Sequence, residues 1–196
     1  MTISNILEHW ATIYKPLSHN PESERLEDQS FFRVRYIDLE NIFSRNANIV
    51  HSPCMLYSVL TTGELIDAKK ASVSHQVWFL AKVKDTPQTL GRYNGLQIEL
   101  ATQELCGMAM DLCVYLAELK RSGGVVCPIT KRSFKSDPQL AMELQALKVE
   151  SIGWSIMPHI IQNNYLCCGV DWESIMPLYN FHCGSAGKYI IPEESI

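Results

Sequence analysis

Residues 97–120 read QIELATQELCGMAMDLCVYLAELK and carry the strongest periodic pattern in the chain. Apolar residues recur there at three- and four-residue steps, which predicts one amphipathic helix. Its apolar stripe comprises Ile98, Thr102, Leu105, Ala109, Leu112, Leu116 and Leu119, widened by Ala101, Met108 and Tyr115, and its opposite face carries Glu99, Gln103, Asp111 and Glu118. Gly123-Gly124 follows as an expected helix end. At about 1.5 Å per residue, this helix is about 36 Å long, enough to cross a whole sheet.

A second amphipathic helix is predicted at the start of the chain. Its apolar positions are Ile3, Ile6, Leu7, Trp10, Ile13 and Tyr14. Pro16 is expected to end this helix, and Trp10 is interpreted as a core anchor. The polar segment Ser18–Gln29 that follows is predicted to be an exposed loop.

Extended segments lie between the two predicted helices. Phe31–Tyr36 alternates and is typical of a short strand. Residues 53–61 have apolar groups on both sides, which indicates a strand covered on both faces. The run from about Leu65 to Val83 is predicted to be one long extended segment. We expect it to form an antiparallel hairpin with 53–61.

A second strand pair is predicted after the long helix. It consists of residues 149–161 and 166–181, with a turn at Asn163-Asn164, because Asn tolerates positive φ. Gly169, Pro158 and Pro177 are expected at bulged or edge positions. Two short helices are also predicted, one around Leu39–Phe43 behind Asp38 and one after Ser136-Asp137-Pro138.

Together these elements predict an α+β fold. We expect an antiparallel or mixed sheet of about four to five strands, packed against the long helix and joined by the N-terminal helix. The chain has 196 residues, which favours one domain. We place this single domain at residues 1–183, with a C-terminal arm or tail at 184–196. A domain of this size buries roughly 70% of its unfolded surface without needing disulfides or metals.

The charge balance argues against a general nucleic-acid binder. The chain has 17 Lys and Arg against 21 Asp and Glu, and its formal net charge is −4. A nucleic-acid binder would show a clustered basic face. The densest basic stretch is Lys131, Arg132 and Lys135, which we interpret as a solvated surface, with a phosphate contact as the alternative.

Cysteine usage predicts a reducing environment. The seven cysteines are odd in number and irregularly spaced, unlike a secreted disulfide framework. The first residues lack the pattern of a signal peptide, and no apolar run reaches the roughly 18 residues of a membrane helix. We therefore expect synthesis in the cytoplasm and no membrane partner.

Two adjacent pairs are the strongest candidates for site chemistry, Cys167-Cys168 and His182-Cys183. Neighbouring strand residues point to opposite faces of a sheet, so only one residue of each pair can face a shared metal ion. The two pairs together therefore offer two ligands, whereas structural zinc takes four. We predict that most cysteines are small buried hydrophobes, Cys106 and Cys113 included. The Gly-rich cluster at 184–188 has no predicted helix after it and is not interpreted as a phosphate loop. We assign no catalytic, cofactor-binding or metal-binding residue, expect no cofactor, and expect the chain not to be an enzyme.

The order of elements over about residues 1–182 resembles the tail-terminator and tail-completion (head–tail joining) proteins of tailed phages and prophages. The shared order is an N-terminal helix, a strand pair, one long helix and a final strand pair. The segments HWATIYKPLSH at 9–19 and SPCM at 52–55 also look like parts of prophage-encoded proteins. This chain departs from compact members by about 20 polar residues after the first helix and by the segment 125–147.

The resemblance implies a structural virion protein, assembled in the host cytoplasm. Such proteins form a homo-oligomeric ring, usually of six subunits, that caps the tail tube and joins it to the head connector proteins. A ring repeats one heterologous contact, and sheet edges in 53–61, 75–83 or 149–181 are the expected contacts. The net negative charge suits passage of DNA through the ring without specific binding.

Three alternatives stay open from the sequence. The first is another virion role, as a head–tail connector or baseplate adaptor. The second is a cytoplasmic binding or regulatory module, and the third is an enzyme that uses a Cys–His pair. The mass of the protein in solution separates ring-forming parts from a monomeric module.

Overall fold

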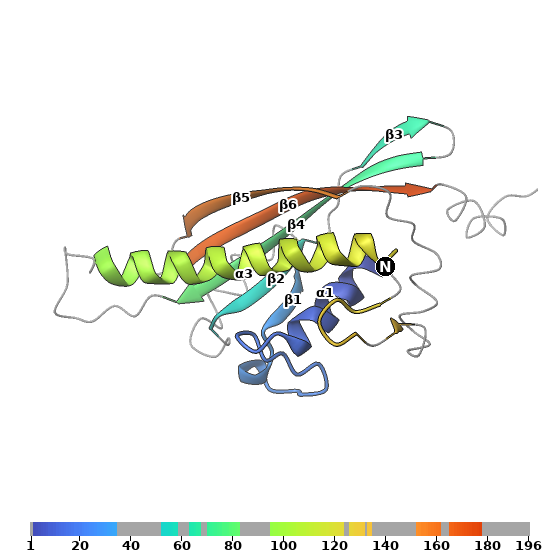
Figure 1. The fold of residues 1–196 in the computed structure, drawn as a ribbon. Coiled ribbons are helices and arrows are strands. Elements are labelled where there is room, and N and C mark those ends of the chain that lie inside the picture. The colour runs from blue at the N-terminus through green and yellow to red at the C-terminus, as the bar shows by residue number, and fades with distance from the viewer. Residues whose placement is uncertain are drawn as a thin grey trace, which may run out of the picture.

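The computed structural model describes residues 2–34, 52–58, 63–67, 70–82, 95–123, 126–131, 133–134, 152–161 and 165–177. The described strands form one mixed sheet, and two helices pack on one of its faces (Figure 1). The predicted α+β class, the long helix on the sheet and the N-terminal helix are confirmed.

The sheet has six strands, five of which follow the order β1-β2-β4-β6-β5. These are β1 (Phe31–Val34), β2 (Cys54–Ser58), β4 (Lys70–Lys82), β6 (Tyr165–Pro177) and β5 (Ile152–Ile161). The sixth strand, β3 (Gly63–Asp67), pairs with the beginning of β4. β1 and β2 are parallel, and the other pairs are antiparallel. The centre of the sheet is the pairing of β4 with β6, which continues over all 13 residues of each strand.

The two helices lie over different parts of the sheet. α1 (Thr2–Ile13) contacts β1, whereas α3 (Gly95–Arg121) packs on β6, β5 and β4. α3 has 27 residues and is therefore about 40 Å long. It ends at Arg121, and Gly123, two residues later, has a φ of 68° and donates its N–H to the carbonyl of Lys120, so the predicted glycine end of the helix is confirmed. The Tyr14 hydroxyl, just after α1, donates to the Asp111 carboxylate of α3 at 2.6 Å.

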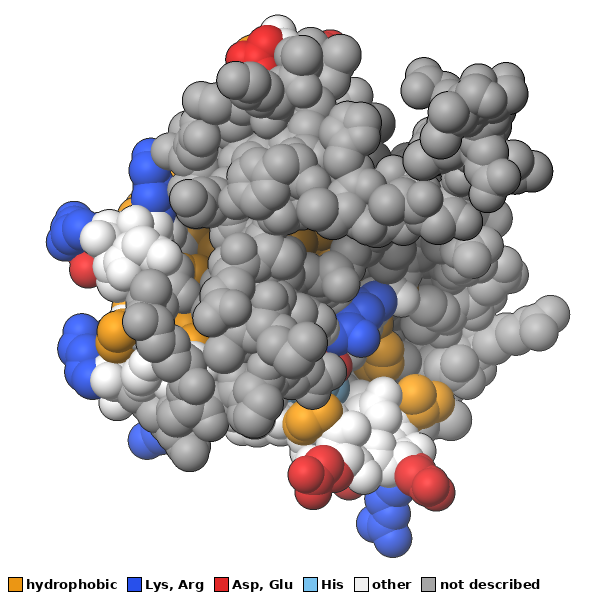
Figure 2. Space-filling model, turned by 90° about the vertical axis from the view of Figure 1, so that its right-hand side faces the viewer, with side chains coloured by type: hydrophobic (Ala, Val, Ile, Leu, Met, Phe, Trp, Pro, Cys, Tyr) orange, Lys and Arg blue, Asp and Glu red, His pale blue; other side chains and the backbone are white. Residues whose placement is uncertain are grey.

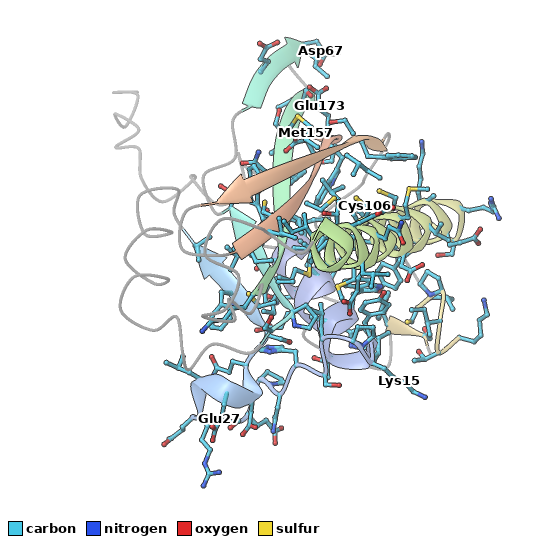
Figure 3. The ribbon with its side chains drawn as sticks, turned by 90° about the vertical axis from the view of Figure 1, so that its left-hand side faces the viewer. Lys15, Glu27, Asp67, Cys106, Met157 and Glu173 are labelled. Atoms are coloured by element: carbon cyan, nitrogen blue, oxygen red, sulfur yellow. The ribbon has the colours of Figure 1, made fainter. Side chains whose placement is uncertain are left out.

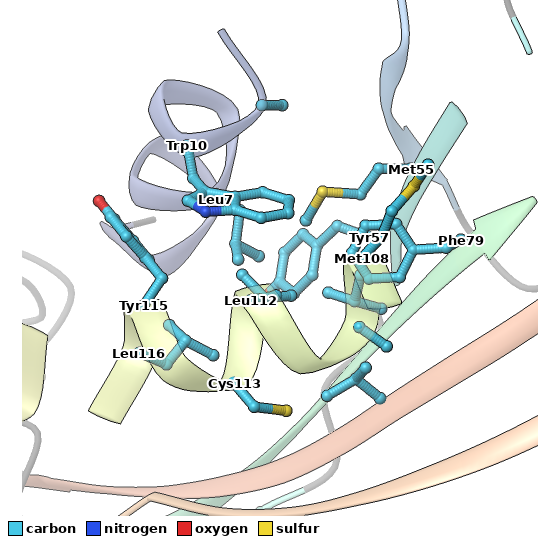
Figure 4. Packing of buried hydrophobic residues seen from close by; sticks show 14 of the residues in the cluster. Leu7, Trp10, Met55, Tyr57, Phe79, Met108, Leu112, Cys113, Tyr115 and Leu116 are labelled. Carbon is cyan, nitrogen blue, oxygen red and sulfur yellow. The ribbon is translucent and has the colours of Figure 1, made fainter. Parts of the chain in front are cut away.

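The main core lies between these helices and the sheet. Trp10 is fully buried there, stacked on Tyr14 with ring centroids 4.4 Å apart and edge-on to Phe79 at 6.0 Å. Figure 4 shows Trp10 of α1 and Leu112 of α3 facing the strand residues of this cluster. The two predicted helical stripes and the role of Trp10 as a core anchor are confirmed.

The opposite face of the sheet is also buried at its centre. Its cluster consists of Val34, Cys54, Leu56, Leu80 and Cys167. All five residues of β2 are buried, as expected for a strand covered on both faces.

Two strand predictions are wrong. The segment after Leu65 is not one strand, because the chain reverses between Asp67 and Lys70 and β3 pairs back onto β4. This pairing gives hydrogen-bond partners to backbone groups of β4 beyond the end of β2. Gly169 is neither a bulge nor an edge residue, since β6 runs between β4 and β5 in unbroken register. A Cβ at Gly169 would lie 3.2 Å from the Trp78 ring, so the glycine permits close packing of that indole.

Most of the polar segment after α1 is exposed as predicted, but His19 is buried. His19 is 5% exposed, and its Nδ1 accepts the backbone N–H groups of Ser30 and Phe31 at 3.2 and 3.3 Å. Burial is the largest effect on His19 and lowers its pKa, so the imidazole is held neutral as an acceptor. The loop is therefore tied to the start of β1.

Several sequence predictions lie outside the described residues. These are the short helices near 39–43 and 138–147, the turn at Asn163-Asn164, the domain boundary at 183 and the arm at 184–196. The hairpin itself is confirmed, because Ile161 pairs with Tyr165. Among the described helices, none combines the length and apolar character that a membrane span requires.

Candidate interaction surface

β5 lies at one end of the strand order and has β6 on one side. Among the described strands, none pairs with its other side. Its ten residues, IGWSIMPHII, include no Asp, Glu, Lys or Arg. Sheet edges usually carry charges, prolines or bulges that prevent pairing with another chain. β5 has only Pro158 of these, and its location on a terminal strand confirms the predicted edge position of this proline.

Apolar side chains are exposed on both faces of β5. Trp154 pairs with Trp172 on the helix-covered face and is 51% exposed. Met157 pairs with Gly169 on the opposite face and is 38% exposed; Figure 3 labels it on β5. β5 therefore has exposed apolar side chains on both of its faces, and its backbone has a partner on one side alone among the described strands.

α3 also carries exposed apolar residues. Asp111 and Tyr115 lie on the side of α3 that faces α1. Met110 precedes Asp111 and Val114 precedes Tyr115, and the side chains of neighbouring helix residues point about 100° apart. Met110 and Val114 therefore point away from the side of α3 that faces α1. They are 48% and 59% exposed. Both residues lie on the helix that also packs on β5. We call Trp154, Met157, Met110 and Val114 the edge surface.

The structure corrects two of the three predicted edges. β2, within 53–61, has β1 and β4 on its two sides. β4, which includes residues 75–82, has β2 on one side and β6 on the other. Only the first strand of the segment 149–181 is an edge. Apolar residues on both faces of a strand mark the centre of a sheet, so those two segments pair inside their own subunit.

The described charges form no single basic face. On the side shown in Figure 2, basic, acidic and hydrophobic side chains are interspersed. Lys131 is exposed and has a φ of 57°, whereas Arg132 and Lys135 lie outside the described residues.

A buried polar network crosses the centre of the sheet. The imidazole of His75 on β4 is hydrogen-bonded through Nδ1 to the Tyr57 hydroxyl at 3.1 Å and through Nε2 to Ser174 Oγ at 2.7 Å. Trp172 stacks on His75 with ring centroids 5.3 Å apart. Burial lowers the pKa of His75 to about 4, so its ring is neutral at neutral pH.

The order of these groups is that of a nucleophile, a base and an orienting hydroxyl. However, Ser174 and Tyr57 are each 1% exposed, so a substrate does not reach them in this conformation. Burial also raises the pKa of Tyr57 to about 12. The network joins β2, β4 and β6 and acts as a structural connection. The sequence offers no signal for it, because residues 57, 75 and 174 meet only through strand pairing.

The cysteines divide between the two faces of the sheet. Cys168 belongs to the helix-side core and Cys167 to the opposite cluster, which confirms that neighbouring strand residues diverge. Burial is the main cause that raises the pKa of Cys54 and Cys167 to about 12 and that of Cys113 to about 11. These thiols therefore stay protonated at neutral pH. His182 and Cys183 lie outside the described residues. Within the described part of the chain, no three His, Cys, Asp or Glu side chains gather as metal ligands.

No protein-family model matches this chain, and no curated protein matches it in sequence.

Proposed function

We propose that this chain is a structural virion protein, a ring-forming tail terminator or neck component that caps a tail tube and joins it to the head connector. Two observations support this proposal. The N-terminal helix, the long helix and the final strand pair of the order that resembles such proteins occur in the fold, although four strands rather than two lie between the helices, and β5 offers an edge strand without charged residues. The edge surface is the observation that carries the proposal.

The occupant proposed for the edge surface is a neighbouring copy of this chain. Copies of a chain with a net charge of −4 repel one another over most of their surface. A contact between copies is therefore favoured where the surface has few charged side chains, and β5, whose ten residues include no charged side chain, meets this condition. Backbone groups of β5 supply the hydrogen bonds, and Trp154 supplies an aromatic anchor of the kind that dominates interface energies.

Ring closure sets a further requirement. In a ring, β5 of one copy meets a different surface of the next copy, whereas pairing of β5 with β5 gives a twofold dimer. The tail tube protein and the head connector proteins would bind the two open faces of the ring. DNA would pass through it without specific binding.

The first test is the mass of the full chain in solution, measured by light scattering at two concentrations. A ring has a mass several times the 22.2 kDa of one chain and changes little between the two concentrations. Addition of purified tail tubes, followed by electron microscopy, should then show the ring at one end of each tube. A twofold dimer, or a monomer at both concentrations, would contradict ring formation by the chain alone.

Trp154→Lys tests whether the edge surface makes this contact. The lysine places a charge in the apolar interface, so we expect the oligomer to dissociate to 22.2 kDa. Ile66→Lys is the matched control, because Ile66 is also a strand residue that is 51% exposed, but it lies on β3. An oligomer that survives Trp154→Lys and dissociates with Ile66→Lys would move the contact to the β3 hairpin.

A further inference from the structure

Two cysteines from distant parts of the chain touch where α3 crosses the sheet. Cys106 Sγ on α3 and Cys168 Sγ on β6 are 3.6 Å apart. Cys168 is 1% exposed, whereas Cys106, labelled in Figure 3, is only half-buried. The pair therefore combines a thiol that solvent reaches with a buried thiol in direct contact with it.

The other described cysteines on α3 and β6 lack this combination. Cys113 is on the same helix as Cys106, but it is 3% exposed and its thiol is buried. Cys167 is also on β6, next to Cys168, but belongs to the cluster on the opposite face of the sheet. An oxidant that reaches the helix-side core therefore meets Cys106 first.

We propose that Cys106 and Cys168 are a reversible oxidation site, at which a peroxide converts the two thiols into an intramolecular disulfide that fastens α3 to β6. The reaction has two balanced steps. The thiolate of Cys106 attacks hydrogen peroxide, forming a sulfenic acid and releasing hydroxide. The Cys168 sulfur then attacks the Cys106 sulfur, its proton leaves with the hydroxyl as water, and the S–S bond forms.

The geometry suits the second step. A disulfide has its sulfurs about 2.05 Å apart, so the two sulfurs must approach by about 1.5 Å. The two sulfurs are already in contact, with no atom between them. Burial raises the pKa of Cys168 to about 12, and its hydrogen bond with Cys106 adds to this effect. Cys168 is thus unreactive alone and reacts as the resolving thiol once Cys106 is oxidised.

The disulfide would change the behaviour of the fold. It links residues 62 positions apart and so restricts the unfolded chain. It also joins the longest described helix to a central strand. We expect the oxidised protein to unfold at a temperature several degrees higher than the reduced protein, and a reducing agent to reverse the change.

The test is peptide mapping by mass spectrometry on the full chain after treatment with hydrogen peroxide, with alkylation of the remaining thiols and without reduction. The expected result is a linked peptide pair containing Cys106 and Cys168, lighter than the two separate peptides by two hydrogens, and lost on reduction. Recovery of both residues as alkylated or singly oxidised cysteines would overturn the proposal, as would a link from Cys168 to Cys113.

Two variants complete the test. Cys106→Ser should abolish both the linked peptide and the thermal shift, whereas Cys113→Ser, the control on the same helix, should retain both. If Cys106→Ser fails to fold, mapping of the wild-type chain still decides the matter. Neither measurement depends on ring formation, so this inference and the proposed function can fail separately.

Discussion

Trp172 and Trp154 are direct cross-strand partners on the same face of the sheet, yet Trp172 is 2% exposed and Trp154 is 51% exposed. Trp172 lies on β6, between two strands, and stacks on His75 within the core. Trp154 lies on β5, a terminal strand of the sheet, which has β6 on one side. Two residues of the same type at paired positions therefore have different roles, one in folding and the other available for association.

The comparison shows that the position of a strand in the sheet, and not only its sequence, determines how exposed its side chains are. Both strands alternate and both carry aromatic residues, so their local patterns are similar. The central strand β6 has a strand on each side, whereas β5 keeps exposed side chains and, among the described strands, has a partner on one side alone. Association can use only the second kind of strand, because its groups are not already satisfied.

The largest expected effect separates the two tryptophans directly. Trp172→Ala should lower the free energy of unfolding by about 3–5 kcal/mol, because it removes a buried aromatic side chain and leaves a cavity. Trp154→Ala, the matched control, should cost less than about 1 kcal/mol, as for an exposed position. Urea denaturation of both variants measures the difference. Equal losses would mean that the edge is as much a part of the core as β6.

The next effect concerns the pH dependence of the buried network. His75 has a pKa of about 4 in the folded protein against 6.5 in the unfolded chain. The unfolded chain therefore binds a proton first as pH falls, and stability decreases from pH 6.5 down to about 4. The full loss is on the order of 3 kcal/mol.

His75→Gln keeps a neutral polar group in the network but removes its titration. Urea denaturation of the wild type and this variant at several pH values should show a shallower decline for the variant between pH 6.5 and about 4. Both proteins share all other titrating groups, including His19, whose pKa is also lowered. If the free energy of unfolding fell equally with pH in both proteins, protonation of His75 would not be the cause of the decline.

The smallest effect compares a buried glycine with an exposed one. Gly169→Ala places a Cβ 3.2 Å from the Trp78 ring and should destabilise the fold by about 1–3 kcal/mol through overpacking. Gly107→Ala lies in α3 with no atom within 4 Å of the new Cβ, and should stabilise the fold by about 1 kcal/mol, the helix preference of alanine. Thermal unfolding should shift in opposite directions. Shifts of the same sign would show that packing at Gly169 does not constrain the strand.

The helices were the most predictable elements of this fold. The apolar stripe at 97–120 predicted α3 to within two residues at its start and one at its end, because helical periodicity is a local property. Pro16 and Gly123 marked the helix ends for equally local reasons. The hairpin of β5 and β6 was also predictable, since its strands are close in sequence.

Pairings between distant segments were not predictable in the same way. The parallel pairing of β1 with β2 joins segments more than 20 residues apart, and nothing in either segment indicates the partner. The reversal into β3 was missed because no glycine or proline stands between Asp67 and Lys70 to mark a turn in the sequence. The edge surface was only partly found: 149–181 was one of three candidate edges, and strand order excluded the other two.

The sequence by itself determined which residues share a face of each helix or strand, because backbone geometry fixes periods of about 3.6 and 2 residues. It also determined the ends of both helices and the separation of Cys167 from Cys168 onto opposite faces. The tertiary structure decided which faces are covered, which strand forms the edge, and which distant groups meet, as in Tyr57–His75–Ser174 and Cys106–Cys168. The physical reason is that the burial and the contacts of a residue depend on neighbours from remote parts of the chain. No local pattern specifies the spatial order of the strands in the sheet.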